Sequence, residues 1–197
     1  MSGADFKVVL LGTEAVGKTS LMKRYVQDRF HPRPHINTIG AAFASKSVSS
    51  RGRQFVMGIW DTAGSERYYA MSQLYYRDAK AAVVCFDLSE RVTFDRAKQW
   101  IIELRNHEED CKIYLCGTKK DVIEDGTKAR AISHEKVLQF SKGIGAVYIE
   151  TSSKTGESVV ELFQLIADNC ELPSAKGKEE SVKLQLSKKS ETCCSAS

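Results

Sequence analysis

One eight-residue segment constrains this chain more than any other: Gly12 to Thr19 reads GTEAVGKT and fits the pattern G-x-x-x-x-G-K-[ST]. A short apolar, β-branched run, Lys7 to Leu11, ends directly before it, and a helix is predicted to begin near Lys18. In such a strand–loop–helix unit the backbone N–H groups turn inward around phosphate oxygens, and the helix N-terminus adds partial positive charge. The predicted phosphate-binding residues are Ala15, Val16, Gly17, Lys18, Thr19 and Ser20.

A second segment adds metal chemistry to the predicted phosphate site. Trp60 to Arg67 reads WDTAGSER at the end of a predicted strand. Lys18 would neutralise oxygens of the β- and γ-phosphates, and the hydroxyl of Thr19 would coordinate Mg²⁺. Asp61 would hold the same ion through water, and the backbone N–H of Gly64 would donate to a γ-phosphate oxygen. Because hydrolysis removes that phosphate, the segment after Gly64 is expected to respond to the state of the nucleotide.

A third segment distinguishes between the bases. Leu115 to Asp121 reads LCGTKKD, again at the end of a predicted strand. Asp121 can accept two hydrogen bonds from the N1 and N2 hydrogens of guanine, a donor pair that adenine lacks, and Lys119 would lie along the base plane. This argues against an ATP-binding kinase or regulator and favours GTP. A second base-contacting loop is expected one strand later, in the segment ETSSK, through Ser152, Ser153 and Lys154.

The spacing of apolar residues predicts an α/β fold. Continuous apolar runs alternate with stretches of helical spacing, and they occupy residues 7–11, 81–86, 113–116 and 146–149. Residues 41–49 and 53–60 indicate a hairpin joined by residues 50–52. We therefore expect a six-stranded, mostly parallel sheet with one antiparallel edge strand and five helices, formed by residues 1–172. Residues 173–197 are polar and are expected to be a disordered tail.

Composition excludes several other classes of protein. The formal net charge of +4 is too small to indicate a nucleic-acid surface. No window approaches the 18 or so apolar residues of a membrane span, and the N-terminus lacks the layout of a signal peptide. We expect a cytosolic monomer that binds no nucleic acid. The cysteines at 85, 111, 116 and 170 lack the spacing of metal ligands and are expected to be reduced packing residues.

With these motifs in place, the sequence resembles the Ras superfamily of small GTPases and, within it, the Rab family. The Rab-type segments are IGAAF, WDTAGSER, LYYRDAKAA and the C-terminal pair Cys193 and Cys194. The resemblance implies a P-loop G domain that binds GTP or GDP with Mg²⁺, hydrolyses GTP and regulates vesicle traffic. It also implies that Thr38 binds Mg²⁺ and the γ-phosphate, and that Phe30 stacks on guanine.

The same resemblance implies a set of protein and membrane partners. Phe43, Trp60 and Tyr75 would dock effectors, although the residue pattern alone favours core positions for these aromatics. The adjacent cysteines look like a double geranylgeranyl site, which would anchor the chain to the cytoplasmic face of intracellular membranes. A single farnesyl on Cys194 is the alternative. The implied partners are a Rab escort protein with its prenyltransferase, a GDP-dissociation inhibitor, an exchange factor, a TBC-type activating protein and effectors.

Two residues depart from the family pattern. Ser65 stands where most Rabs have glutamine, the residue that orients the attacking water in Ras, so intrinsic hydrolysis is expected to be slower by at least about tenfold. Thr118 stands where the family has asparagine, which contacts guanine and ties the base loop to the phosphate loop. Losing one hydrogen bond there would weaken nucleotide retention by about two- to tenfold.

These departures are similar to an atypical Rab branch, the one numbered twenty-four. That similarity implies a role in autophagy, on autophagosomal or late endosomal membranes. The main hypothesis is a slow GTPase switch whose catalytic residues are Lys18, Thr38, Gly64 and Ser65. The alternative, which Ser65 favours, is a GTP-loaded effector-binding module with negligible hydrolysis.

Overall fold

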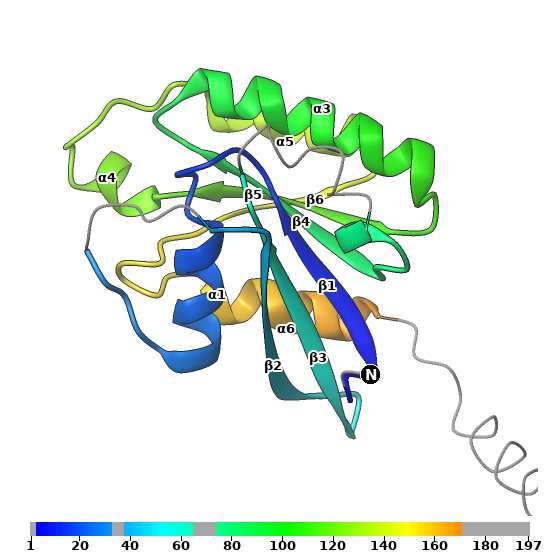
Figure 1. Ribbon diagram of the computed structural model, residues 1–197. Coiled ribbons are helices and arrows are strands. Elements are labelled where there is room, and N and C mark those ends of the chain that lie inside the picture. Colours follow the sequence, from blue (N-terminus) through cyan, green and yellow to red (C-terminus); the bar gives the residue numbers. More distant parts are fainter. Residues whose placement is uncertain (1–2, 33–37, 65–73, 171–197) are drawn as a thin grey trace, which may run out of the picture.

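A six-stranded sheet divides the molecule into two layers of helices (Figure 1). The structure is a computed structural model and describes residues 3–32, 38–64 and 74–170. The strands, in chain order, are β1 (Phe6–Leu11), β2 (Ala41–Ser50), β3 (Arg53–Thr62), β4 (Ala81–Asp87), β5 (Lys112–Thr118) and β6 (Val147–Glu150). Their order in the sheet is β2-β3-β1-β4-β5-β6, and only β2 runs antiparallel to its neighbour. The predicted sheet is confirmed.

Five helices have both ends within the described residues. They are α1 (Lys18–Gln27), α3 (Arg91–His107), α4 (Lys120–Glu124), α5 (His134–Gly143) and α6 (Val159–Asn169). Residues 74–76 are helical as well. The prediction of five helices was therefore one helical element short. None of the helices within these residues has the length and apolar character that a bilayer span requires.

The hydrophobic core has two parts, one on each face of the sheet. Side chains alternate along β1, so Val8 and Leu10 pack with α1 and α6, whereas Val9 and Leu11 pack with α3 and α5. Figure 1 shows the same two layers, with α1 and α6 on one face and α3 and α5 on the other. Every residue of β4 is buried, as predicted for a strand covered on both faces.

The β2–β3 hairpin is paired in register from Ala41 opposite Thr62 to Ser50 opposite Arg53. Arg51 and Gly52 form the turn, with φ values of 50° and 73°. Two consecutive residues with positive φ are typical of the tight turns that suit the twist of a hairpin. The turn is thus one residue shorter than the predicted linker, because Ser50 is the last residue of β2.

The parallel strands all end at one edge of the sheet, and each predicted motif follows one of these ends. The phosphate loop follows β1, the segment containing Gly64 follows β3, Lys119 and Asp121 follow β5, and the ETSSK loop follows β6. Loops at the carboxyl ends of strands are where open α/β sheets bind ligands. The fold therefore brings together segments that lie 130 residues apart in the sequence.

Candidate functional site

The phosphate loop lies tightly against the sheet. A Cβ atom built on Gly12 would lie 2.4 Å from the carbonyl oxygen of Cys85, and Gly12 has a φ of 136°. Gly17 also has a positive φ, 102°, and directly precedes α1. Ala15 has a φ of 60°, a conformation that disfavours residues with a Cβ. The loop therefore forms with one strained position, at Ala15.

Lys18 is held by the loop that it follows. Its Nζ donates hydrogen bonds to the carbonyl oxygens of Gly12, at 2.7 Å, and Thr13, at 2.8 Å. The residue is only 5% exposed. Burial lowers the pKa of the Lys18 ammonium, against an opposing attraction to Asp61 and other neighbouring acidic groups. An ammonium has three N–H donors, so this arrangement can direct the remaining one at an anionic ligand.

The three predicted metal ligands lie within hydrogen-bonding distance of one another. Thr19 Oγ1 donates to Asp61 Oδ2 at 2.6 Å and lies 3.0 Å from Thr38 Oγ1. Burial raises the pKa of the Asp61 carboxyl, although the hydrogen bond from Thr19 and the charge of Lys18 act to lower it. Three separate segments, at the start of α1, before β2 and at the end of β3, thus place their oxygens together.

Two buried polar atoms without hydrogen-bond partners indicate a binding site for a ligand or an ion at this position. Within the described residues, Thr13 Oγ1 and Asp61 Oδ1 are the buried side-chain oxygens that have no hydrogen-bond partner, and both belong to this site. Buried groups of this kind need a ligand, an ion or water. No group of three or more His, Cys, Asp or Glu side chains suited to a metal occurs in the same part of the chain. Hydroxyls and one carboxylate fit Mg²⁺, which takes oxygen ligands and retains waters.

Gly64, which follows β3, packs against the phosphate loop. A Cβ atom on Gly64 would lie 2.2 Å from the backbone nitrogen of Glu14, so its backbone packs directly on the phosphate loop. This places the Gly64 peptide beside the predicted phosphate position. Ser65, the next predicted residue, lies outside the described residues.

The residues predicted to contact the base also meet. Ser152 Oγ donates to Asp121 Oδ1 at 2.7 Å, and Lys154 Nζ lies 3.8 Å from Asp121 Oδ2. Lys119 Nζ donates to Asp87 Oδ2 at 2.6 Å. Burial alone would raise the pKa of Asp87, but hydrogen bonds from Lys119 and Ser89 lower it. Asp87 was missed by the sequence reasoning, because nothing near it in the chain distinguishes it from a residue that ends a strand.

Thr118 makes the loop-to-loop connection that the family asparagine was expected to make. Its hydroxyl lies 2.6 Å from the carbonyl oxygen of Val16 in the phosphate loop and 2.9 Å from that of Phe86. One hydroxyl proton can serve only one of these acceptors at a time. Threonine thus provides a tie between the base side and the phosphate side, and the prediction that nucleotide retention is weaker stays a prediction.

The aromatic residues of the predicted effector surface are only partly in the core. Phe43 is 47% exposed, and its ring centroid lies 4.6 Å from that of Trp60, its partner across the hairpin. Trp60 and Tyr75 are half-buried. The interpretation of these aromatics as core residues is therefore wrong for Phe43.

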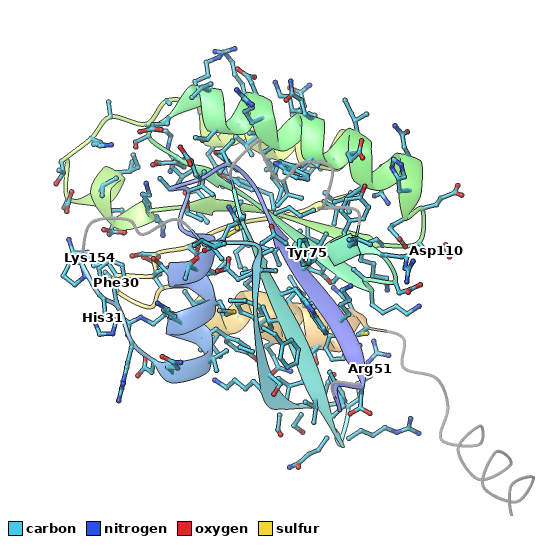
Figure 2. The ribbon with its side chains drawn as sticks, viewed as in Figure 1. Phe30, His31, Arg51, Tyr75, Asp110 and Lys154 are labelled. Atoms are coloured by element: carbon cyan, nitrogen blue, oxygen red, sulfur yellow. The ribbon has the colours of Figure 1, made fainter. Side chains whose placement is uncertain are left out.

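Phe30 is half-buried too, and Figure 2 draws it at the same margin of the molecule as Lys154. Cys193 and Cys194 lie outside the described residues.

Glu150, at the start of the ETSSK loop, is the centre of a cluster that sequence reasoning also missed. Arg130 donates to both of its carboxylate oxygens, at 2.7 and 2.8 Å, and Tyr148 and His134 bond to Oε1. Burial alone would raise the pKa of Glu150, but these partners, Arg130 first, lower it to about 2. The partners precede it by 2 to 20 residues with no regular spacing, so no motif reveals them.

This cluster predicts a pH dependence of stability. Since the pKa of Glu150 falls from its usual 4.5 to about 2 on folding, its charge stabilises the fold above pH 4.5 and is lost toward pH 2. The unfolding free energy of the natural protein is expected to fall as the pH drops from 5 to 3. In Glu150→Gln this fall should be smaller by about 2 kcal/mol, because the variant has no carboxylate to protonate at this position. Urea unfolding across this range tests it. Glu161→Gln, at an exposed site on α6, is the control, and an equal change there would contradict the assignment.

Comparison with known proteins gives one family. The sequence matches the Ras family over residues 7–172. It is 45% identical over 165 residues to Ras-related protein Rab-24 of Dictyostelium discoideum, and this alignment covers 84% of this chain and 80% of that protein. Ras-related protein Rab-21 of Geodia cydonium is 40% identical over 159 residues, covering 80% and 67%. GTP-binding protein YPT52 of Saccharomyces cerevisiae is 37% identical over 190 residues, covering 83% and 81%.

Proposed function

The chain belongs to the Ras family and, within it, to the Rab small GTPases, and from this premise we propose that it is a membrane-anchored switch with slow intrinsic GTP hydrolysis. Rab proteins bind GTP or GDP with Mg²⁺ and are GTP hydrolases of vesicle transport. The slow rate, the membrane anchor and the individual site residues are our proposal for this chain. The observation that carries the nucleotide and Mg²⁺ site of this proposal is the pair of unpartnered buried oxygens, Thr13 Oγ1 and Asp61 Oδ1, beside the clustered Thr19 and Thr38 hydroxyls.

The proposed mechanism assigns each group a task. Thr19 and Thr38 would hold Mg²⁺, with Asp61 holding it through water, and the bound ion would stabilise negative charge on the β- and γ-phosphate oxygens. Lys18 directs its ammonium at the same oxygens, and its burial strengthens that attraction. The Gly64 peptide, which packs on the phosphate loop, donates to the γ-phosphate. Loss of that phosphate on hydrolysis releases the segment that follows.

Base recognition is proposed to use the second half of the site. Asp121 accepts from the N1 and N2 hydrogens of guanine while Ser152 fixes one of its oxygens. Lys119 lies along the ring, and Phe30 stacks on its face. Ser153 and Lys154 complete the loop beside the base. An adenine nucleotide would leave the Asp121 carboxylate without its donor pair, which favours guanine.

The rate of hydrolysis is the part of the proposal that one substitution tests. Ser65→Gln is expected to speed single-turnover hydrolysis of preloaded GTP with Mg²⁺ by at least about tenfold, because glutamine carries the paired amide groups that orient water and serine does not. Ser65→Ala is the matched comparison, and any loss of rate in it measures what the serine side chain itself contributes to hydrolysis. The measurement is phosphate release at saturating enzyme.

If Ser65→Gln leaves the rate unchanged, the missing glutamine does not limit hydrolysis. The protein is then better described by the second candidate function, a GTP-loaded module that binds effectors with negligible hydrolysis. A TBC-type activating protein, which can supply arginine and glutamine from outside, distinguishes the two further, since it would restore turnover only in the first.

Membrane attachment is proposed through the tail. Residues 1–172 form the G domain in this proposal, and residues 173–197 carry geranylgeranyl groups on Cys193 and Cys194. Two lipid chains suffice for stable anchoring, while one does not. The role in autophagy rests on the resemblance of Ser65 and Thr118 to the branch numbered twenty-four. Effectors would then bind the surface around Phe43, Trp60 and Tyr75, where exposed aromatic area is available.

A further inference from the structure

Arg24, in the last turn of α1, contacts two segments that lie near the predicted base site. Its Nε donates to the carbonyl oxygen of Ser153 at 2.7 Å, and its Nη2 donates to that of Lys154 at 2.8 Å. Its Nη1 donates to Asp28 Oδ1 at 2.9 Å and lies 3.2 Å from the Asp28 carbonyl oxygen. One guanidinium thus joins the ETSSK loop to the end of α1 across about 130 residues of sequence.

The geometry requires a guanidinium. Nε and one terminal nitrogen form a fixed, parallel pair of donors, and here they match two successive carbonyl oxygens. The Arg24 side chain is only 17% exposed, so these bonds are partly shielded from water. A lysine ammonium carries the same charge at a single point and cannot present two donors in this spacing.

Each of the two segments that Arg24 joins adjoins a residue predicted to contact the base. Ser153 and Lys154 follow Ser152, whose hydroxyl bonds to Asp121. Asp28, with a φ of 52°, ends α1 and lies two residues before Phe30. Figure 2 places Phe30 and Lys154 at the same margin of the molecule. If Arg24 lost these contacts, the loop on one side and the approach to Phe30 on the other would move independently.

The start of the ETSSK loop is anchored in other ways. The Thr151 N–H donates to the carbonyl oxygen of Gly117, and the Lys120 N–H donates to that of Thr151. Glu150 is held by the cluster around Arg130. These contacts fix the loop where it leaves β6, and hydrogen bonds of Ser152 with Thr155, Gly156 and Glu157 close the rest of the loop into a turn. Arg24 adds the bonds that tie this turn to the end of α1.

We propose that Arg24 is a positioning residue for the guanine base, and that its contacts with Ser153, Lys154 and Asp28 set the rate at which GDP leaves the site. This inference rests on the proposed function, because it requires guanine to lie between these segments. Arg24 does not contact the reacting phosphate in this scheme. Its replacement changes nucleotide release and base discrimination and leaves the rate of bond cleavage unchanged.

The test compares Arg24→Lys with a matched arginine elsewhere. Arg105, in the last turn of α3, also donates to backbone carbonyl oxygens, those of Glu109, Cys111 and Ile144. These acceptors lie near Asp110, which Figure 2 draws at the margin opposite Phe30 and Lys154. Arg24→Lys is expected to speed release of fluorescently labelled GDP by about tenfold, whereas Arg105→Lys is expected to leave it unchanged.

A second measurement distinguishes a specific effect on the position of the guanine base from a general loosening of the nucleotide site. Inosine diphosphate lacks the 2-amino group and so offers Asp121 one donor fewer than GDP. If Arg24 positions the base loop, the preference for GDP over inosine diphosphate in release rate should shrink by a factor of about three in Arg24→Lys. Single-turnover GTP hydrolysis should keep its rate. Hydrogen exchange at residues 150–156 should accelerate in this variant and not in Arg105→Lys.

Three results would overturn the inference. They are an unchanged GDP release rate in Arg24→Lys, equal acceleration by Arg105→Lys, and acceleration of both diphosphates by the same factor. If Arg24→Lys fails to fold, hydrogen exchange of the natural protein decides: residues 150–156 must be protected more in the GDP complex than without nucleotide. If the natural protein binds no guanine nucleotide, the proposed function fails, which is a different outcome from any of these.

Discussion

Lys18→Ala is expected to weaken GDP binding by about a thousandfold, because it removes a charged donor shared between phosphate oxygens in a buried site. The one N–H of Lys18 that is left for the phosphates gives a charge-assisted hydrogen bond of about 1.5 to 3 kcal/mol, and the loss of the buried positive charge beside the phosphates adds to it. The loop would also lose its own internal support, since Lys18 Nζ bonds to the carbonyl oxygens of Gly12 and Thr13. Titration calorimetry with GDP and Mg²⁺ measures the effect.

The control is a lysine on the same helix. Lys23 is exposed, so Lys23→Ala changes the net charge equally without touching the phosphate loop. It should bind GDP within about twofold of the natural protein. A similar loss in both variants would mean that the site responds to overall charge, and Lys18 would then have no special role at the phosphates.

Gly12→Ala is expected to lower the free energy of unfolding by about 4 kcal/mol, through backbone strain and a steric clash acting together. Gly12 has a φ of 136°, and an added Cβ would lie 2.4 Å from the carbonyl oxygen of Cys85. The obstacle is backbone in the central sheet and cannot move aside as a flexible side chain could. Because domains are stable by only about 5 to 15 kcal/mol, this is a large fraction of the total.

Gly52→Ala separates the cost of backbone strain from the cost of the steric clash. Gly52 also has a positive φ, 73°, but no atom outside its neighbours lies within 4 Å of an added Cβ. This variant should lose only about 1 kcal/mol, the strain of the backbone. Urea unfolding of nucleotide-free protein gives both values, since bound nucleotide would add its own stabilisation. If the two glycine variants lose the same amount, the contact with Cys85 is unimportant.

Local patterns explain why so much of this molecule could be predicted. Strand β1, the phosphate loop and the start of α1 are consecutive, so strand, glycine spacing and helix are visible in one segment. The hairpin is equally local. The coming together of Thr19, Asp61 and Asp121 at one edge then follows from a rule of topology, because parallel strands must end on the same side.

Contacts between distant residues with no spacing rule could not be predicted. Arg24 is one of 29 basic residues, and its sequence position looks like an ordinary place for a helix C-terminal charge. Its acceptors in the ETSSK loop are backbone carbonyl oxygens, which no sequence pattern identifies. Phe43 shows a second limit, since the residue pattern alone favours a core position for this aromatic, whereas its side chain is 47% exposed. Its exposure depends on packing beyond the hairpin.

The position of β1 in the sheet has a consequence for the order in which the protein can be made. β1 is the first strand to be synthesised, yet it pairs with β3 and β4, which come about 50 and 75 residues later. The phosphate loop therefore cannot take its shape on a growing chain until Asp87 has been added. The base loops need the chain to extend to Lys154. Nucleotide can thus assist folding only after β1 to β6 have been made, as a ligand that binds chains in which these strands are already paired.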